Sequence, residues 1–477
     1  MKSRLTLPMA LLLSTPCFAA QEDRPMNIIY ILCDDLGYGD LACYGQQYIK
    51  TPNLDKMANE GMQFMQHYAG CSVSAASRCS IMTGLHTGHS QVRGNKEIQP
   101  EGQEAMAADT YTIARLMQNA GYKTGLFGKW GLGSPTSVSV PNTMGYDEFF
   151  GYNCQRHAHT YFPDYLWENT KRVELKANRN KGKKIYSQDL IHEHAKKFIK
   201  ENKDRPFFAM LTYTIPHAEL NLPHDDFYKR YEHSFKEKPY VSDGYHEGHG
   251  GYDSCEKPKA SFAAMISRLD FYVGDIINQL KELGLDKNTM VFFTSDNGPH
   301  YEGGADPNFF KSNGPFKGYK LDLYEGGIRV PFIAWAPGTI PAGKKSEHIS
   351  AFWDLMPTLA DITRTRVGAH TDGISYLPTL LGKEDQQQHH YLYWEFHMFG
   401  GRQAIRVGDW KLIRMPINGK TVVELYNLKE DVHEDHNLVL KYPNKVAELV
   451  NLMNTARTES ALFDTGEWLN LDKAIGH

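Results

Sequence analysis

The chain has 477 residues, which is enough for a large core and for two or three domains. Its net charge of −4, with 23% charged residues, lacks the strongly basic field typical of nucleic-acid binding. The seven Cys residues follow no zinc-ligand spacing, and a chain of this length needs no disulfide framework. We therefore expect a folded protein with no nucleic-acid partner.

Residues 1–20 have the pattern of an export signal. Lys2 and Arg4 give a basic start, and the apolar run at residues 5–13 is too short to cross a membrane. No later stretch approaches the roughly 20 apolar residues of a transmembrane helix. We therefore expect no membrane span and export to the periplasm or the cell exterior. A lipoprotein acylated at Cys17 is the alternative.

Residues 27–32 form a continuous apolar run, which predicts a strand buried on both faces of a parallel sheet. The run leads into Asp34 and Asp35. Two adjacent carboxylates at the end of a buried strand are costly unless a positive group lies between them. Ligands also gather at this edge of an open α/β sheet. Asp34 and Asp35 are therefore candidate cation ligands, with a solvated loop pair as the alternative.

The stretch around Ser74 carries the most specific pattern. Ser74 is followed by a small residue two positions on, by Arg78 four positions on, and by Thr83-Gly84. This pattern resembles the signature of the sulfatase family, in which the first residue is oxidised to formylglycine (3-oxoalanine), an aldehyde whose hydrate attacks sulfur. The resemblance implies that Ser74 is that residue and that Arg78 orients it. Cys71 fails the spacing, because Ala75 stands where the Arg is required.

Lys129 follows a strand expected at residues 123–127 and resembles the family Lys that binds sulfate and formylglycine. Gly131 stands where the family usually has a His that contacts the formylglycine, so the chain departs from the pattern there. A nearby loop contains His157 and His159. A branch of bacterial sulfatases that this chain resembles pairs the Gly variant with an Ala-His-x-Tyr loop. We therefore expect His159, rather than His157, to replace the missing contact.

Two further residues match the family by position. Pro216 and His217 follow a strand expected at residues 206–212 and resemble the His that protonates the leaving alcohol. An alkoxide leaves poorly, and a positioned His can supply the proton. Lys320, which three residues separate from Tyr-Glu-Gly-Gly, resembles the second sulfate-binding Lys.

Asp296 and Asn297 follow the strand expected at residues 289–294. Together with Asp34 and Asp35 they form a set of oxygen donors without His or Cys, which favours calcium or magnesium over zinc. All four match the calcium ligands of the family, so the resemblance implies a Ca²⁺ site.

Three more residues are candidate substrate contacts. Arg93 lies in the loop after the Ser74 stretch, and His300 and Asp306 follow the expected metal ligands. The alternative for each is an ordinary loop role. The polar insertion at residues 219–258 is expected to wall the substrate cleft.

Apolar runs alternate with helical patterns, which predicts an α/β fold with a large mixed, mostly parallel sheet sandwiched by helices. Short strands between turn residues and a last helix predict a small C-terminal antiparallel sheet with one helix. The family, part of the alkaline phosphatase superfamily, implies a catalytic domain at residues 21–378 and a subdomain at 379–477. The main strands are expected at residues 27–32, 123–127, 206–212, 289–294 and 330–334, and the main helices at 112–120, 187–202, 262–283, 354–362 and 441–457.

The resemblance implies a sulfuric ester hydrolase that acts on sulfated glycans. The chain is similar to bacterial, exo-acting carbohydrate sulfatases that remove sulfate from galactose or N-acetylgalactosamine at O4 or O6, and we favour O4. A Ser precursor implies an anaerobic sulfatase-maturating enzyme as partner. Two alternatives remain open: a phosphodiesterase or phosphonate hydrolase of the same superfamily, and a non-catalytic glycan-binding protein in which Ser74 is never oxidised.

Overall fold

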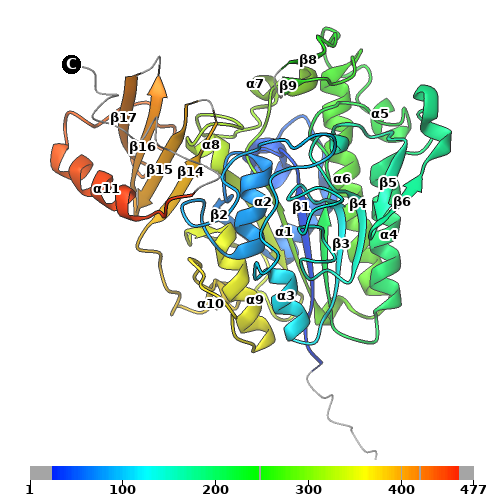
Figure 1. Cartoon of the computed structure of the whole chain (residues 1–477), viewed down its shortest axis with the longest axis horizontal. Helices are drawn as coiled ribbons and strands as arrows, with labels where there is room; N and C mark the ends of the chain where they lie inside the picture. Colours follow the sequence, from blue (N-terminus) through cyan, green and yellow to red (C-terminus); the bar gives the residue numbers. More distant parts are fainter. Residues whose placement is uncertain (1–23, 247–248, 399, 418–419, 461–477) are drawn as a thin grey trace, which may run out of the picture.

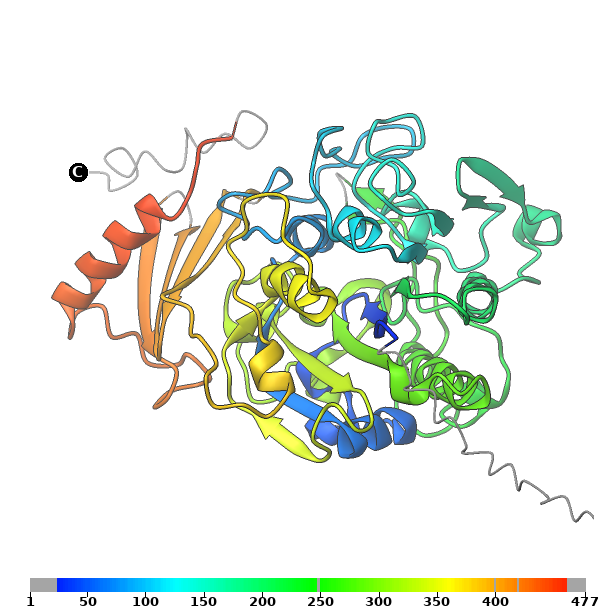
Figure 2. The same cartoon turned by 90° about the horizontal axis from the view of Figure 1, so that it is seen from below.

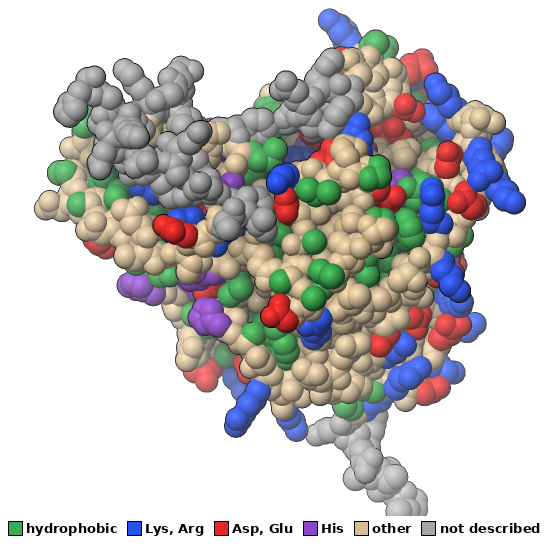
Figure 3. Space-filling view, in the orientation of Figure 1, with side chains coloured by type: hydrophobic (Ala, Val, Ile, Leu, Met, Phe, Trp, Pro, Cys, Tyr) green, Lys and Arg blue, Asp and Glu red, His purple; other side chains and the backbone are tan. Residues whose placement is uncertain are grey.

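The computed structural model of the protein describes residues 24–246, 249–398, 400–417 and 420–460 (Figure 1). The export signal expected at residues 1–20 lies outside these residues. None of the described helices has the length and apolar character needed to span a bilayer. On the face shown in Figure 3, basic and acidic side chains are interspersed.

A mixed sheet of 11 strands forms the centre of the molecule, in the order β12-β2-β11-β10-β1-β7-β3-β4-β5-β6, with β13 beside β2 (Figure 1). β10, β1, β7, β3 and β4 run parallel to one another, whereas β11 is antiparallel to β10 and β2. This confirms the expected mixed, mostly parallel sheet. The strands are β1 Asn27–Cys33, β2 Met62–Tyr68, β3 Lys123–Lys129, β4 Glu148–Tyr152, β5 Tyr165–Glu168, β6 Lys171–Glu174, β7 Phe207–Thr212, β10 Thr289–Ser295, β11 Arg329–Trp335, β12 Lys344–Ser346 and β13 Ser350–Ala351.

Helices cover both faces of this sheet (Figure 2). Successive side chains of β1 point to opposite faces, as the period of a strand requires. Ile29 and Ile31 pack in the core with α1, α4 and α6, and Ile28 and Tyr30 pack in the core with α2, α3 and α9. The helices of the first face are α1 Pro52–Glu60, α4 Ser187–Glu201 and α6 Pro258–Glu282, and those of the second are α2 Ser74–Thr83, α3 Ile113–Asn119 and α9 Leu355–Thr363.

The C-terminal part forms a separate antiparallel sheet of 4 strands, β14-β15-β16-β17, as expected from the short strands in the sequence. One face carries α11 through Leu449 and Met453. The other face packs Trp394 against Tyr68 and Trp353 of the large part. The elements are β14 Leu392–Phe396, β15 Arg402–Val407, β16 Trp410–Ile417, β17 Lys420–Asn427 and α11 Pro443–Thr455.

The remaining elements are short and lie in loops. They are α5 Asp226–Lys229, β8 Tyr245–His246, β9 His249–Gly250, α7 Pro307–Phe310, α8 Glu325–Ile328 and α10 Leu377–Leu380. α5, β8 and β9 fall within the insertion at residues 219–258. The parallel strands β10, β1, β7 and β3 all end at the same edge of the large sheet, so the polar residues that follow them meet there.

Candidate active site

Ser74 is the first residue of α2, so its hydroxyl lies at the positive end of that helix. Its Oγ donates a hydrogen bond to Asp296 Oδ2 at 2.5 Å and accepts one from Arg78 Nε at 2.8 Å. Residues four positions apart share a helix face, which is why Arg78 reaches back to Ser74. Arg78 also donates to Asp296 Oδ2 and to the Lys129 carbonyl oxygen, both at 2.9 Å. The hydroxyl is therefore held between a fixed cation and a carboxylate.

The four expected metal ligands converge at the ends of β1 and β10, and all are fully buried. Asn297 Nδ2 donates to Asp35 Oδ1 at 2.6 Å, and the Asp35 amide donates to Asp296 Oδ1 at 3.2 Å. Within the described residues, Asp34 Oδ1 and Asn297 Oδ1 have no hydrogen-bond partner. Buried polar atoms are rarely left unpaired, and unpaired oxygens are the ligands that a hard cation takes. The donor set therefore fits Ca²⁺.

Two lysines flank the carboxylates. Lys129, the last residue of β3, donates a hydrogen bond from Nζ to Asp34 Oδ2, and burial lowers its pKa despite that carboxylate. Lys320 Nζ contacts Asp35 Oδ2 at 2.9 Å and Glu302 Oε2 at 2.6 Å. Burial alone would lower the pKa of Lys320, but Asp35 and Glu302 raise it well above its ordinary value. Lys320 therefore remains a cation at the site.

His217 follows β7 and lies beside Lys320. Its Nδ1 donates to the Ala218 carbonyl oxygen, which leaves Nε2 facing Lys320 Nζ at 3.2 Å. Burial, and then the charge of Lys320, lower the pKa of His217 well below its ordinary value. The ring is therefore neutral in this state, and Lys320 donates the hydrogen bond between them.

A pocket gives access to Ser74, His217 and Lys320. Loops from several parts of the chain line it, including the insertion at residues 219–258, which contributes Tyr252. The insertion thus borders this pocket through Tyr252. The remaining lining residues are Val73, Asn95, Glu97, Gln103, Gln155, Arg156, His159, Glu302, Leu321 and Met398.

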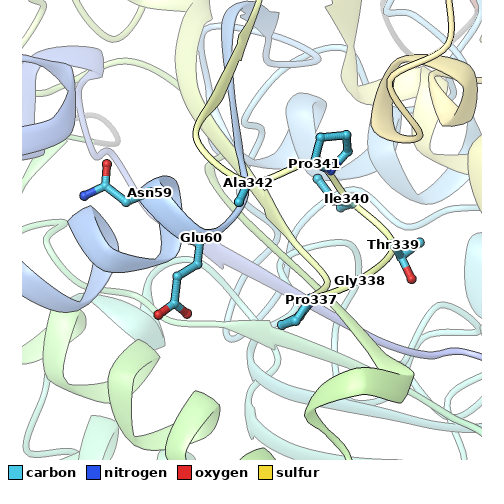
Figure 4. Close-up of a pocket in the computed structure, with 8 residues that line it drawn as sticks. All are labelled: Asn59, Glu60, Pro337, Gly338, Thr339, Ile340, Pro341 and Ala342. Carbon is cyan, nitrogen blue, oxygen red and sulfur yellow. The ribbon is translucent and has the colours of Figure 1, made fainter.

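A wider hollow lies elsewhere, between Asn59, Glu60 and residues 337–342 (Figure 4). Trp335 at the end of β11 pairs with Val291 near the start of β10, so this hollow is at the opposite edge of the sheet from Asp296. Glu60 is the one charged residue among its lining residues, all of which the structure describes. This hollow therefore lacks the groups that ester hydrolysis requires.

The structure separates the two candidate histidines of the loop after β4. The His159 ring stacks on His217 with centroids 5.0 Å apart and lines the pocket. The His157 ring packs against Tyr165 at 4.2 Å, and its Nδ1 lies 3.6 Å from a Glu101 carboxylate oxygen. His159 therefore reaches the pocket, whereas the space beside Gly131 is filled by another residue, Gln155.

Arg93 and Asp306 were expected to contact substrate, but the structure places both in other roles. Arg93 is buried and donates to Glu395 Oε1 at 2.7 Å, because a buried guanidinium requires a counter-charge. It thereby links the large part to β14. Asp306 accepts a hydrogen bond from the Phe309 amide at the start of α7 and pairs with Lys259 Nζ at 3.1 Å.

His300 lies behind the pocket rather than in its lining. Its ring stacks on His217 with centroids 5.6 Å apart, and its Nε2 donates to the Pro216 carbonyl oxygen at 3.2 Å. Its Nδ1 accepts from the Glu302 amide at 3.0 Å. His300 therefore supports His217 and fixes the loop that carries Glu302.

Glu302, Tyr252 and Gln155 line the pocket although the sequence did not single them out. Tyr252 packs against His159 with ring centroids 5.1 Å apart. Glu302 binds Lys320 across 18 residues of sequence. No spacing pattern in the sequence predicts these contacts, because they depend on how three loops pack together.

The fold and the sequence together define a sulfuric ester hydrolase of the alkaline phosphatase-like superfamily. The sulfatase family model matches residues 26–365, and the model of the N-sulphoglucosamine sulphohydrolase C-terminal region matches residues 318–459. The chain therefore belongs to the sulfatase family, which confirms the resemblance seen in the Ser74 pattern. That family generally uses Ca²⁺ and formylglycine.

Individual relatives support this assignment. N-acetylgalactosamine-6-sulfatase of Canis lupus familiaris is 32% identical, covering 76% of this chain and 67% of that protein. N-acetylgalactosamine-6-O-sulfatase of Bacteroides thetaiotaomicron is 28% identical, covering 92% and 94%. The solved structure of Ps i-CgsB in complex with k-i-k-neocarrahexaose superposes with a TM-score of 0.77 at 27% identity, covering 93% and 95%. Phosphonate monoester hydrolase of Agrobacterium radiobacter, at 20% identity and a TM-score of 0.65, shares the fold alone.

Proposed function

We propose that this protein is an exported bacterial exo-sulfatase that removes the 6-O-sulfate of a terminal N-acetylgalactosamine or galactose residue in a glycan. The observation that carries the proposal is the position of Ser74, bonded to Arg78 and Asp296 beside the unpaired oxygens of Asp34 and Asn297. The sequence alone favoured O4. Two relatives are named for the 6-sulfate of N-acetylgalactosamine, and they shift the proposal to O6.

The residues around Ser74 have distinct roles in this proposal. Oxidised Ser74 would supply the aldehyde hydrate that attacks sulfur, and Ca²⁺ held by Asp34, Asp35, Asp296 and Asn297 would draw charge from the sulfate oxygens. Arg78 fixes the attacking atom. Lys129 and Lys320 place two cations beside the sulfate, where negative charge develops in the transition state.

His217 supplies the proton to the departing sugar oxygen. Its Nδ1 is committed to the Ala218 carbonyl oxygen, so Nε2 is the atom that exchanges a proton. The low pKa of the ring keeps it neutral at rest. Binding of an anionic sulfate brings negative charge close to the ring, which favours the protonated form that acts as the acid.

Exo action is favoured by access through a pocket, because Ser74 itself is only 2% exposed. A terminal sugar can enter such a pocket more readily than an internal one.

A Ser precursor also makes the protein a substrate of an anaerobic sulfatase-maturating enzyme, so an active preparation requires co-expression with that enzyme.

The proposal is tested by assaying the matured protein on a set of defined esters. The set contains 6-O-sulfated and 4-O-sulfated N-acetylgalactosamine and galactose together with a phosphate diester, and sulfate or alcohol release is measured. We expect the 6-O-sulfated sugars to be the best substrates. Faster turnover of the 4-O-sulfates would restore the assignment made from sequence, and faster turnover of the phosphate diester would replace the proposal with a phosphodiesterase.

A further inference from the structure

The space beside Gly131 is occupied by the side chain of Gln155. Gly131 has a φ of 77°, and a Cβ added there would lie 2.4 Å from Gln155 Nε2 and 3.8 Å from Arg78 Cδ. The two loops run side by side, because the Trp130 and Gly131 amides donate to the Tyr152 and Asn153 carbonyl oxygens at 2.9 Å. The Gln155 amide group therefore lies beside Gly131, on the side of this residue that faces Arg78, which binds Ser74.

The Gln155 side chain is buried in a fixed loop, but its amide nitrogen lacks a hydrogen-bond acceptor within the described part of the chain. The residue is 4% exposed, and its backbone amide donates to Gln103 Oε1 at 2.7 Å, which fixes the loop. Its Nε2 has no hydrogen-bond partner among the described residues. Gln155 and Ser74 line the same pocket. A buried donor without a partner is costly, so this one indicates an acceptor that arrives with the substrate.

Unlike the Gln155 amide nitrogen, the neighbouring polar groups already contact other residues. The His159 ring stacks on His217 and packs against Tyr252. Arg78 is fully engaged with Ser74, Lys129 and Asp296. An amide donor also stays neutral at every pH, so Gln155 adds a hydrogen bond without adding charge to a site already crowded with ions.

We propose that Gln155 is a substrate-binding residue whose Nε2 donates a hydrogen bond to an oxygen of the sulfate group bound beside Ser74. The inference rests on the proposed function, since it assigns the acceptor to a sulfate ester. It also explains why residue 131 is a glycine: any larger side chain there would collide with the donor.

The test compares two Gln→Met variants of the matured full chain. Gln155→Met keeps the length of the side chain and removes the donor, so kcat/KM for the sulfated sugar should fall about tenfold to a hundredfold, as expected for one hydrogen bond to a charged group. Its thermal unfolding midpoint should not fall, because the lost group had no partner. In the control Gln63→Met, a bonded Nε2 is lost from β2, which should lower the midpoint and leave kcat/KM unchanged.

Two further measurements separate the possible outcomes. Gly131→His alone should reduce activity through its collision with Gln155, whereas Gly131→His combined with Gln155→Ala should be more active than Gln155→Ala alone. Calorimetric titration of inorganic sulfate into the calcium-loaded protein should show about tenfold weaker binding by Gln155→Met. Unchanged sulfate affinity and unchanged kcat/KM in Gln155→Met would overturn the inference. Absence of sulfate release by the wild type would instead overturn the proposed function, while the sulfate titration would still decide the role of Gln155.

Discussion

Each charged side chain around Ser74 is buried beside a partner of opposite charge. Asp296 meets Arg78, Asp34 meets Lys129, and Asp35 meets Lys320. Burial, and then the neighbouring Asp34, raise the pKa of Asp296, and a divalent cation beside it would favour its ionised form. At the scale of single residues, the site therefore holds fixed cations that can bind an anion, and we propose that His217 is the group that changes its protonation state.

The acid role of His217 can be isolated by changing the leaving group. His217→Ala should slow release of sulfate from a sugar by about a hundredfold to ten-thousandfold, because the alkoxide then departs without a proton. An aryl sulfate with an acidic phenol leaving group should lose far less activity. The measurement is the ratio of kcat values for the two substrates in each variant. His157→Ala, whose ring packs on Tyr165 outside the pocket, should leave the ratio unchanged. Equal losses on both substrates would contradict the acid role.

At the scale of elements, β3 positions Lys129 through an unusually close fit with its neighbours. A Cβ on Gly128 would lie 2.0 Å from the Thr212 carbonyl oxygen of β7. On the other side of the strand, a Cβ on Gly151 of β4 would lie 1.9 Å from the Gly128 carbonyl oxygen. Glycine at these two positions lets the strands approach, and Lys129 is the next residue of β3.

The close fit can be tested with Gly128→Ala. The methyl group would push β3 from β7, which should lower the free energy of unfolding by at least about 2 kcal/mol and also reduce the rate of sulfate release. Gly121→Ala is the matched control, since Gly121 also has a positive φ of 84° but open space around its Cβ. It should cost about 1 kcal/mol through backbone strain alone and leave the rate unchanged. Urea unfolding and activity assays give both quantities, and equal destabilisation by the two variants would refute the argument.

At the scale of the whole molecule, Glu395 of β14 ties the C-terminal sheet to the large part. It is fully buried and contacts Arg93 Nη1, Arg457 Nε and His397 Nε2, each at 2.7 Å. Burial alone would raise the pKa of Glu395, but His397, Arg457 and Arg93 hold it well below its ordinary value of 4.5. The carboxylate therefore stabilises the fold above pH 4.5, and that stabilisation is lost as the pH falls toward its folded pKa.

Glu395→Gln should remove this contribution. The variant should lose about 3 to 5 kcal/mol of unfolding free energy at pH 7, because buried cations are left without their anion. At pH 3.5 the gap to the wild type should narrow by about 1.4 kcal/mol, since the wild-type unfolded chain is then protonated at Glu395. Glu448→Gln on α11, which loses an exposed pair with Lys445, should change stability by less than about 0.5 kcal/mol. A gap of the same size at both pH values, measured by urea unfolding, would contradict this role.

The sequence predicted the parts of the site that follow from strand ends and motif spacing. Asp34, Asp35, Asp296 and Asn297 follow apolar runs, so their convergence could be anticipated. β2 was not anticipated, because Gln63 and His67 interrupt its apolar pattern; their side chains are buried and bonded to the Cys43 carbonyl oxygen and to Ser350.

Contacts between distant loops were also beyond prediction. The pairing of Arg93 with Glu395 spans 302 residues, and only the folded chain reveals it. The same holds for Gln155 beside Gly131, because the closeness of the two loops depends on β3 pairing with β4. Motif spacing singled out the residues to which we assign the reaction, whereas the packing of loops determines the residues that surround them.

The central claim is that oxidised Ser74 performs sulfate ester hydrolysis. The most direct test compares sulfate release from 6-O-sulfated N-acetylgalactosamine by two preparations of the full chain, made with and without an anaerobic sulfatase-maturating enzyme. Mass spectrometry of the peptide that contains Ser74 reports the loss of two hydrogen atoms. We predict sulfate release in proportion to the oxidised fraction, and none from Ser74→Ala. Equal release by both preparations, or release by Ser74→Ala, would contradict the claim.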